Sequence, residues 1–366
     1  MRRATDNGPF VRRLTALAAV AMLVVLLAAP SAEAKGSSFF GLNFSFRDMS
    51  GKDVRKLKAS GAKTVRWAFF WARLEHFSGQ FNWDASDKVV GDLASKGIRV
   101  LPILYGTPSW VAKSPNRAPI GSQKERDAWK QLLQEAVKRY GPNGSYWAGP
   151  YQADHPGKAA LPIQTWQIWN EPNLESHWAP HPDPGDYATL LKISDSAIKG
   201  ADPSAKVMFA GMPGYSNDIN AWDYMRRVYK KQGVRNDFDL AALHPYGHTI
   251  HQMLAEMQRV RKVMRKSGDG SKPMWVTEIG WGSLPENATP YHLTKGMKGQ
   301  AKILKQAFHA LKQKRHKWHI KKVLWFNFRD PGGGAVDICS FCSSAGLLKN
   351  NYKPKPSWSA FRKFTR

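Results

Sequence analysis

The run Ile163-Gln164-Thr165-Trp166-Gln167-Ile168-Trp169-Asn170-Glu171-Pro172-Asn173 is an apolar segment that ends in a carboxylate and a proline. Its apolar part predicts a buried β-strand. Pro172 has no N–H to donate and disfavours helix at the preceding residue, so we expect the strand to end here with Glu171 in extended backbone. A carboxylate at the end of a buried strand is a candidate catalytic group. A second carboxylate at the end of another such strand would strengthen this interpretation.

Seven other segments resemble this strand in length and composition, and amphipathic helical stretches separate them. With 163–169, the predicted strands are 39–44, 64–70, 99–104, 205–210, 238–244, 274–278 and 321–328. The predicted helices are 52–60, 86–96, 123–139, 184–199, 220–232, 249–266, 298–314 and 358–364. Eight strand–helix units with no internal linker predict the α/β class and a single (β/α)8 TIM barrel. An open doubly wound sheet is the alternative, but Gly41-Leu42-Asn43-Phe44-Ser45 lacks the glycine pattern of its dinucleotide-binding form.

The first 34 residues have the pattern of a secretory signal peptide. Four arginines within the first 13 residues precede an apolar run at 14–29, and an Ala-x-Ala site ends at Ala34. We therefore expect cleavage after Ala34, a single domain at 35–366 with no stable membrane span, and a secreted or extracytoplasmic location, with association to the cell envelope as one form of it. A retained signal anchor is the alternative.

The chain is strongly basic. Its formal net charge is +27, and removal of 1–34, with four arginines against Asp6 and Glu33, leaves +25. This charge predicts attraction to polyanions. The basic residues are spread over the predicted helices, so solvated helix faces explain each run taken singly. No nucleic-acid-binding motif accompanies the charge, so nucleic acid is not an expected partner.

Cys339 and Cys342 are the only cysteines, and they lie in a loop rich in glycine and serine. In an exported chain this C-x-x-C spacing favours a local disulfide over a redox motif. A metal site would need further ligands nearby, and the sequence shows none. We therefore expect no metal and no cofactor.

In a barrel of this kind the active-site side chains lie at the carboxyl ends of the strands. The predicted strand ends carry Asn43, Arg66, Tyr105, Asn170, Glu171, His244, Tyr246, Glu278, Trp325 and Asn327. Two carboxylates, Glu171 and Glu278, therefore face one mouth. Cleavage of a glycosidic bond needs such a pair, one protonated to assist the leaving oxygen and one ionised at the anomeric carbon. We expect Arg66 to keep Glu278 ionised, and tryptophan neighbours to raise the pKa of Glu171 so that it stays protonated.

Two of these segments carry a family resemblance. Trp169-Asn170-Glu171-Pro172 and Trp275-Val276-Thr277-Glu278-Ile279-Gly280-Trp281 resemble the fourth- and seventh-strand signatures of glycoside hydrolase clan A, the retaining (β/α)8 glycosidases, closest to the family 39 and family 5 types. The resemblance covers 35–366 and implies that Glu171 is the acid/base and Glu278 the nucleophile. It also implies that Asn170 binds the sugar 2-hydroxyl, that Arg66 and Tyr246 support the nucleophile, that His244 lies near the acid/base, and that Trp325 forms a sugar platform.

Several further points stay open at this level. Trp110, Trp178 and Trp281 are candidate sugar platforms, with burial as loop anchors the alternative for each. The resemblance predicts a glycosidase that hydrolyses a β-linked poly- or oligosaccharide, and the charge favours an acidic or envelope-associated glycan. The alternatives are a transglycosylase on the same scaffold and a non-catalytic carbohydrate-binding barrel at the cell envelope.

Overall fold

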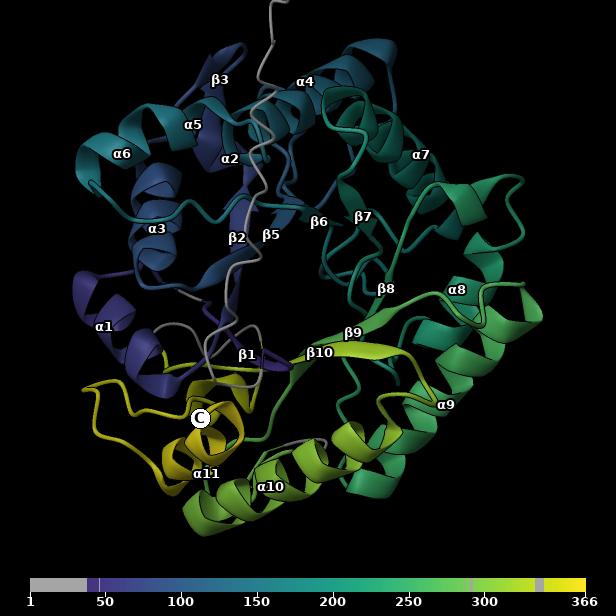
Figure 1. Cartoon of the computed structure of the whole chain (residues 1–366). Coiled ribbons are helices and arrows are strands. Elements are labelled where there is room, and N and C mark those ends of the chain that lie inside the picture. The colour runs from purple at the N-terminus through teal and green to yellow at the C-terminus, as the bar shows by residue number, and fades with distance from the viewer. Residues whose placement is uncertain (1–37, 46, 287, 290–291, 333–338) are drawn as a thin grey trace, which may run out of the picture. The chain divides into compact units, whose positions relative to one another are not determined.

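Eight parallel strands form the centre of the computed structural model, which describes residues 38–45, 47–286, 288–289, 292–332 and 339–366 (Figure 1). The strands are β1 (Phe40–Asn43), β2 (Thr64–Phe70), β5 (Arg99–Tyr105), β6 (Thr165–Ile168), β7 (Lys206–Met208), β8 (Ala241–Leu243), β9 (Met274–Ile279) and β10 (Ile320–Trp325). Their order in the sheet is β7-β6-β5-β2-β1-β10-β9-β8. A parallel bridge between Met208 and Leu240 joins the two outer strands, so the sheet is a nearly closed barrel. The predicted (β/α)8 fold is confirmed. The predicted signal peptide lies outside the described residues.

Helices fill the connections between the strands (Figure 1). The longer ones are α1 (Gly51–Ser60), α3 (Asp84–Ser95), α4 (Gln123–Tyr140), α7 (Pro184–Ala201), α8 (Ala221–Val228), α9 (Ile250–Lys266), α10 (Gly296–Lys314) and α11 (Pro356–Thr365). Short elements that the sequence did not predict are α2 (Trp71–Leu74), the hairpin β3 (Glu75–Phe77) and β4 (Gln80–Phe81), α5 (Ser145–Ala148), α6 (Pro150–Asp154), η1 (Val234–Asn236) and η3 (Cys342–Ser344). Within the described part of the chain, no helix is both long enough and apolar enough to span a membrane.

The ends of α1 show how the sequence fixes the helix boundaries. The Ser50 side chain accepts a hydrogen bond from the Asp53 N–H, and the Asp53 carboxylate accepts one from the Ser50 N–H, which is a capping box. Gly61 ends the helix in the left-handed conformation (φ 83°), which glycine adopts without a steric penalty. The chain can therefore reverse at once and begin β2 at Thr64.

The barrel interior is packed with apolar side chains below the strand ends. Residues from different strands form one buried cluster there: Leu101, Met208, Leu240, Ala242 and Leu324. A larger apolar cluster, which includes Val65, Leu104 and Trp166, involves both strands and helices. Closely packed apolar side chains therefore lie beneath the polar side chains at the carboxyl ends of the strands. This packing limits the exposure of the polar side chains to water.

Glu256 in α9 is a buried carboxylate with an unusual environment. The residue is fully buried, and neither carboxylate oxygen has a hydrogen-bond partner among the described residues. The side chain lies beneath Gly214 in the loop after β7, where an added Cβ would come within 2.0 Å of Glu256 Oε2. Burial raises the pKa of Glu256 to about 8, against a smaller opposing effect of Arg259. At neutral pH the folded chain therefore keeps this group protonated.

A pH dependence of stability follows from this carboxyl group. Between about pH 4.5 and about pH 8 the folded chain binds a proton at Glu256 that the unfolded chain does not. The free energy of unfolding therefore falls by about 1.4 kcal/mol for each unit of rising pH, on the order of 5 kcal/mol in all. Glu256→Gln removes this titration. We expect urea unfolding to show a difference between variant and parent that grows in favour of the variant from pH 5 to pH 8 and then levels off. If the free energies of unfolding of variant and parent changed in parallel with pH, the protonated state of Glu256 in the folded chain would be contradicted.

Candidate active site

The sequence Trp169-Asn170-Glu171 leaves the barrel directly after β6 in a constrained conformation. Trp169 and Glu171 have positive φ angles of 69° and 47°, a region that costs a non-glycine residue on the order of 1 kcal/mol or more. A parallel bridge from Asn170 to Gly211 and a 2.9 Å hydrogen bond from the Glu171 N–H to the Gly211 carbonyl oxygen hold this turn. The expectation of an extended Glu171 is wrong, because these contacts to the end of the β7 strand override the preference that Pro172 imposes.

Glu278, near the end of β9, is held by two donors. Arg66 Nη1 lies 2.5 Å from Glu278 Oε1, and the Tyr246 hydroxyl donates to Oε2 at 2.6 Å. The carboxylate is 8% exposed. Burial and the negative charges of Glu278 and Glu171 raise the pKa of Tyr246 well above its ordinary value, so the phenol keeps its proton and donates. The cation and the phenol together fix the orientation of the Glu278 carboxylate.

Arg66 connects four strands at the mouth of the barrel. Its guanidinium donates to Gln167 Oε1 at 2.7 Å, to Asn43 Oδ1 at 3.2 Å and to Asn170 Oδ1 at 2.8 Å, besides Glu278. Arg66 is 2% exposed, so these contacts replace water as its partners. The buried guanidinium fixes the position of Glu278 relative to Asn170, next to Glu171.

Glu171 lies between two imidazoles. His244 Nδ1 is 2.7 Å from Glu171 Oε1, and His177 Nε2 is 3.6 Å from Oε2. Burial raises the pKa of Glu171, but the hydrogen bond from His244 and the charges of His177, His244 and Arg66 outweigh burial, so the pKa lies below its ordinary value. The expectation of a raised pKa is therefore wrong. The sequence led us to expect that tryptophan neighbours would set the pKa of Glu171, whereas His244, His177 and Arg66 lower it.

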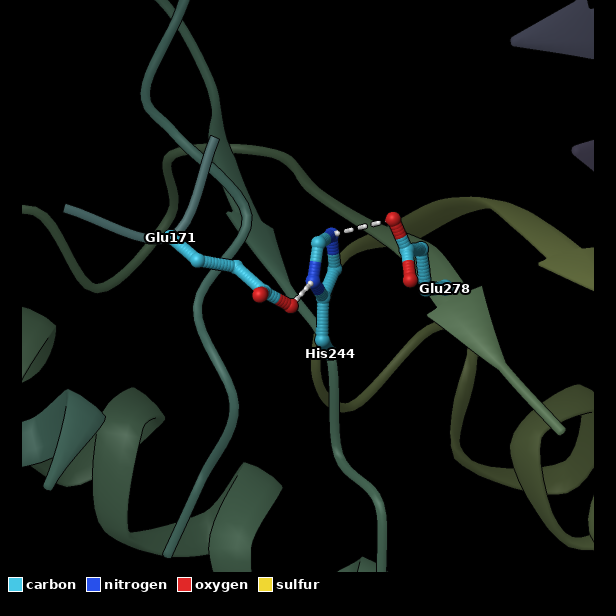
Figure 2. A group of neighbouring side chains, drawn as sticks. All are labelled: Glu171, His244 and Glu278. Atoms are coloured by element: carbon cyan, nitrogen blue, oxygen red, sulfur yellow. Dashed lines mark hydrogen bonds and ion pairs between the residues drawn. The ribbon is translucent and has the colours of Figure 1, made fainter. Parts of the chain in front are cut away.

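Figure 2 shows His244 between the two carboxylates, with its ring nitrogens toward Glu171 and Glu278. His244 Nε2 lies 3.7 Å from Glu278 Oε1, and one oxygen of each glutamate lies within 4.8 Å of the other. Such a group could in principle surround a divalent cation. Arg66 already places a positive charge on Glu278, and a metal ion would have to compete with it, so the arrangement suits proton transfer between carboxyl groups better.

The close approach of His244 to the strand end after β7 requires a glycine. A Cβ at Gly211 would lie 2.0 Å from His244 Nε2 and 2.6 Å from Thr277 Oγ1. Gly211 and Gln167 were not singled out from the sequence. Gln167 carried a signal, since a polar residue within the apolar run of β6 needs a buried partner, here Arg66. A lone glycine carried none.

Three of the four tryptophans predicted as sugar platforms are buried. Trp281 and Trp325 are 0% exposed and Trp178 is 1% exposed. The indole N–H groups of Trp281 and Trp325 donate to the carbonyl oxygens of Gly247 and Ala345. This placement does not support their role as sugar platforms, because no ring face is open. Trp178 and Trp281 anchor loops, which is the alternative that the sequence left open for them. Trp325 ends strand β10 and packs against Trp281.

Trp178 packs edge-on against Trp169 and Tyr187, with ring centroids 5.4 and 5.8 Å apart. Trp110 remains partly exposed, although its N–H donates to the Glu75 carbonyl oxygen. The aromatic rings that pack against Tyr246 are instead Phe326 and Phe341, with centroids 6.3 and 5.2 Å away.

Cys339 and Cys342 form a disulfide in the loop that follows β10. The bridge closes a turn in which the Cys342 N–H donates to the Cys339 carbonyl oxygen at 3.1 Å. Phe341, between the two cysteines, packs against Tyr246. The disulfide therefore stiffens a loop that reaches the side of the mouth where Glu278 lies.

Solved structures with the same fold come from glycoside hydrolases of clan A. A family 39 glycoside hydrolase from the gut symbiont Bacteroides cellulosilyticus WH2 is 20% identical to this chain, with a TM-score of 0.65. The match covers 90% of this chain and 63% of the other protein, so this chain spans less than two thirds of the length of that relative. A family 39 β-xylosidase from Caulobacter crescentus is 20% identical (TM-score 0.63; 90% and 72% covered). A subfamily 18 enzyme of family 5 from Streptomyces cattleya, solved with Manβ1-4GlcNAc, is 16% identical (TM-score 0.64; 89% and 80% covered). These likenesses show the fold.

A family model described as the glycosyl hydrolase catalytic core matches residues 151–352. This range contains Glu171, His244, Tyr246 and Glu278, whereas Arg66 lies before it. The predicted resemblance to clan A is confirmed by the model and the fold together. Because the matched range is more than half of the sequence, the chain belongs to the glycosyl hydrolase catalytic core family.

Proposed function

We propose that this chain is a glycosidase that retains the anomeric configuration, with Glu278 as nucleophile and Glu171 as acid/base. The observation that carries the proposal is the spacing of the pair, whose nearest carboxylate oxygens lie within 4.8 Å of each other. Retaining enzymes hold their carboxyl groups roughly 5 to 5.5 Å apart, while inverting enzymes leave about 6.5 to 9.5 Å for a water molecule. The pair leaves no room for a water between nucleophile and sugar.

The environments of the two carboxylates support this assignment of roles. Arg66 and Tyr246 donate to opposite oxygens of Glu278, which orients the carboxylate for attack on the anomeric carbon. The Asn170 oxygen accepts from Arg66, which leaves the NH2 group of Asn170 to donate to a sugar hydroxyl. Glu171 is linked to His244, and a proton on this pair can reside on either group. In the first step Glu171 protonates the glycosidic oxygen, and in the second it accepts a proton from the attacking water.

The lowered pKa of Glu171 sets the expected working range of the enzyme. The protonated acid that the first step needs is depleted as the pH rises through that pKa. Activity should therefore be highest under acidic conditions. As substrate we propose a β-linked glycan, since β-xylosidase and β-mannoside-bound enzymes share the fold. The net charge of +25 that 35–366 carries favours an acidic or envelope-associated glycan outside the cytoplasm.

A screen on aryl glycosides and on neutral and acidic polysaccharides tests this function, with the Glu278→Gln variant as the blank. Proton NMR of the first-formed sugar should show the same anomer as the substrate. The opposite anomer would rule out retention and the role of Glu278 as nucleophile. Product analysis at high sugar-acceptor concentration separates hydrolysis from transglycosylation, and glycan binding without any turnover would favour a non-catalytic barrel. The amino terminus of the exported protein should be Lys35 if the signal peptide is cleaved as proposed.

Tyr246→Phe removes one hydroxyl and its 2.6 Å hydrogen bond to Glu278. Hydrogen bonds to a charged group contribute about 1.5 to 3 kcal/mol, so we expect kcat/KM to fall roughly 10- to 100-fold. Steady-state kinetics on the best aryl glycoside measures the loss. Tyr229→Phe is the matched control, because its hydroxyl also donates to a carboxylate, that of Asp269, away from the mouth. Equal losses in both variants would show that the effect on Tyr246 is structural.

A further inference from the structure

The two oxygens of the Glu171 carboxylate have different partners. Oε1 is held by His244 at 2.7 Å, within hydrogen-bond distance. Oε2 faces His177 Nε2 at 3.6 Å, too far for a direct hydrogen bond but close enough for an ion pair when the imidazole carries a proton. Oε1 is therefore occupied within the protein, and Oε2 is the oxygen that is free to meet a leaving group.

His177 lies on the open side of this carboxylate. The His244 side chain is fully buried, that of Glu171 is 13% exposed and that of His177 is 21% exposed. Exposure thus rises from His244 through Glu171 to His177, in the direction from which a substrate must enter.

The position of His177 is fixed by the loop that carries it. Its N–H donates to the Leu174 carbonyl oxygen at 3.0 Å, and its own carbonyl oxygen accepts from the indole N–H of Trp169 at 2.8 Å. Its ring nitrogen Nδ1 lies 2.9 Å from Ser176 Oγ, which orients Nε2 toward Glu171. The neighbouring Trp178 is buried and anchors the segment. These hydrogen bonds hold His177 in a defined position at the mouth of the barrel.

We propose that His177 is a positioning residue for proton transfer, which stabilises the ionised form of Glu171 and leaves Oε2 as the oxygen that exchanges a proton with the leaving group and with water. The inference rests on the proposed acid/base role of Glu171. The proton on Oε2 passes to the glycosidic oxygen as the glycosidic bond breaks, and Oε2 regains one from the attacking water, so the step balances without a co-reactant.

Other groups around Glu171 set the background against which His177 acts. Arg66 from β2, Tyr105 from β5, Glu278 from β9, and His244 and Tyr246 after β8 interact with it. His177, in contrast, lies on the same loop as Glu171, on the more exposed side of the carboxylate. Its removal should therefore change the charge seen by Oε2 without breaking the Arg66 network.

The test compares two replacements of His177 that differ in charge. His177→Gln keeps polarity and removes the ring that can bind a proton, and His177→Lys places a lasting positive charge at this position. Carbon-13 NMR of the full chain labelled at the glutamate carboxyl, with the Glu171 signal assigned by its loss in Glu171→Gln, follows the titration without a substrate. We expect the Glu171 midpoint to move to higher pH in His177→Gln and to stay at or below the parent value in His177→Lys. An unchanged midpoint in both variants would overturn the proposal.

Kinetics gives a second readout that a merely structural role would not change. In His177→Gln the alkaline fall of kcat/KM should move to higher pH, so that kcat/KM at pH 6, relative to its own acidic plateau, rises about threefold. An equal loss at every pH would mean a structural role only. His181→Gln, an exposed histidine four residues along the same loop, is the matched control and should leave the profile unchanged. Thermal melting checks that each variant is folded.

The outcomes separate this inference from the proposed function. If Glu171→Gln and Glu278→Gln lose turnover while the His177→Gln profile and NMR midpoint match the parent, only the role of His177 fails. If the two glutamate variants keep turnover, the proposed function fails, and the NMR titration still shows whether His177 controls the charge of Glu171.

Discussion

Replacing Glu278 with glutamine is expected to reduce kcat/KM roughly 10⁴-fold or more, since loss of a covalent nucleophile in other hydrolases has an effect of this order. The carboxylate attacks the anomeric carbon in the proposed mechanism, and no neighbour can take its place. His244 is engaged with Glu171, and Tyr246 keeps its proton and is a donor. Glu278→Gln keeps the size of the side chain, so Arg66 and Tyr246 should stay in position.

Two measurements check this result. Turnover of the best aryl glycoside should fall to the level of the blank, and a 2-deoxy-2-fluoro glycoside should label the parent chain by one sugar mass but leave Glu278→Gln unlabelled. Glu286→Gln, the same chemical change at an exposed glutamate in the loop after β9, is the control and should keep full activity. Labelling of a peptide that lacks Glu278 would contradict its role as nucleophile.

The fold could be predicted from the sequence because each unit repeats the same local pattern. Runs such as 163–169 and 274–278 are apolar and short, and the helices between them are amphipathic, so the period of the pattern identifies the elements. The strand bounds were less predictable. β8 spans only Ala241–Leu243 within the predicted 238–244, because backbone pairing in a barrel depends on neighbours far along the chain. The hairpin after β2 was missed for a different reason: its strands are only three and two residues long, too short for an alternating pattern to show.

The residues of the site could also be gathered from the sequence, since parallel strands bring their carboxyl ends together. Their charge states could not. Whether a buried carboxylate gains or loses a proton depends on distances of a few ångström to His177 and His244, and spacing in the sequence does not contain them. The tryptophans show the same limit. Trp178 and Trp281 have the composition of a sugar platform and the burial of a loop anchor, and only packing decides between these roles.

Glu171→Gln should affect the two steps of the reaction differently, because a general acid matters most where the leaving group is poor. For a substrate with a sugar or alcohol leaving group we expect kcat/KM to fall roughly 10²- to 10⁴-fold, the usual contribution of acid–base catalysis. For an aryl glycoside with an acidic phenol, bond cleavage needs little protonation. Loss of the base should then slow the second step and let the glycosyl-enzyme on Glu278 accumulate.

A plot of log kcat/KM against the leaving-group pKa, measured for a series of aryl glycosides, should therefore be steeper for Glu171→Gln than for the parent chain. Azide, an anion that needs no base, should restore turnover of the activated substrate and give a glycosyl azide with the anomeric configuration of the substrate. Glu175→Gln, an exposed glutamate on the same loop, is the matched control and should show neither effect. A uniform loss across the series, without azide rescue, would mean that Glu171 holds the structure of the mouth instead of transferring a proton.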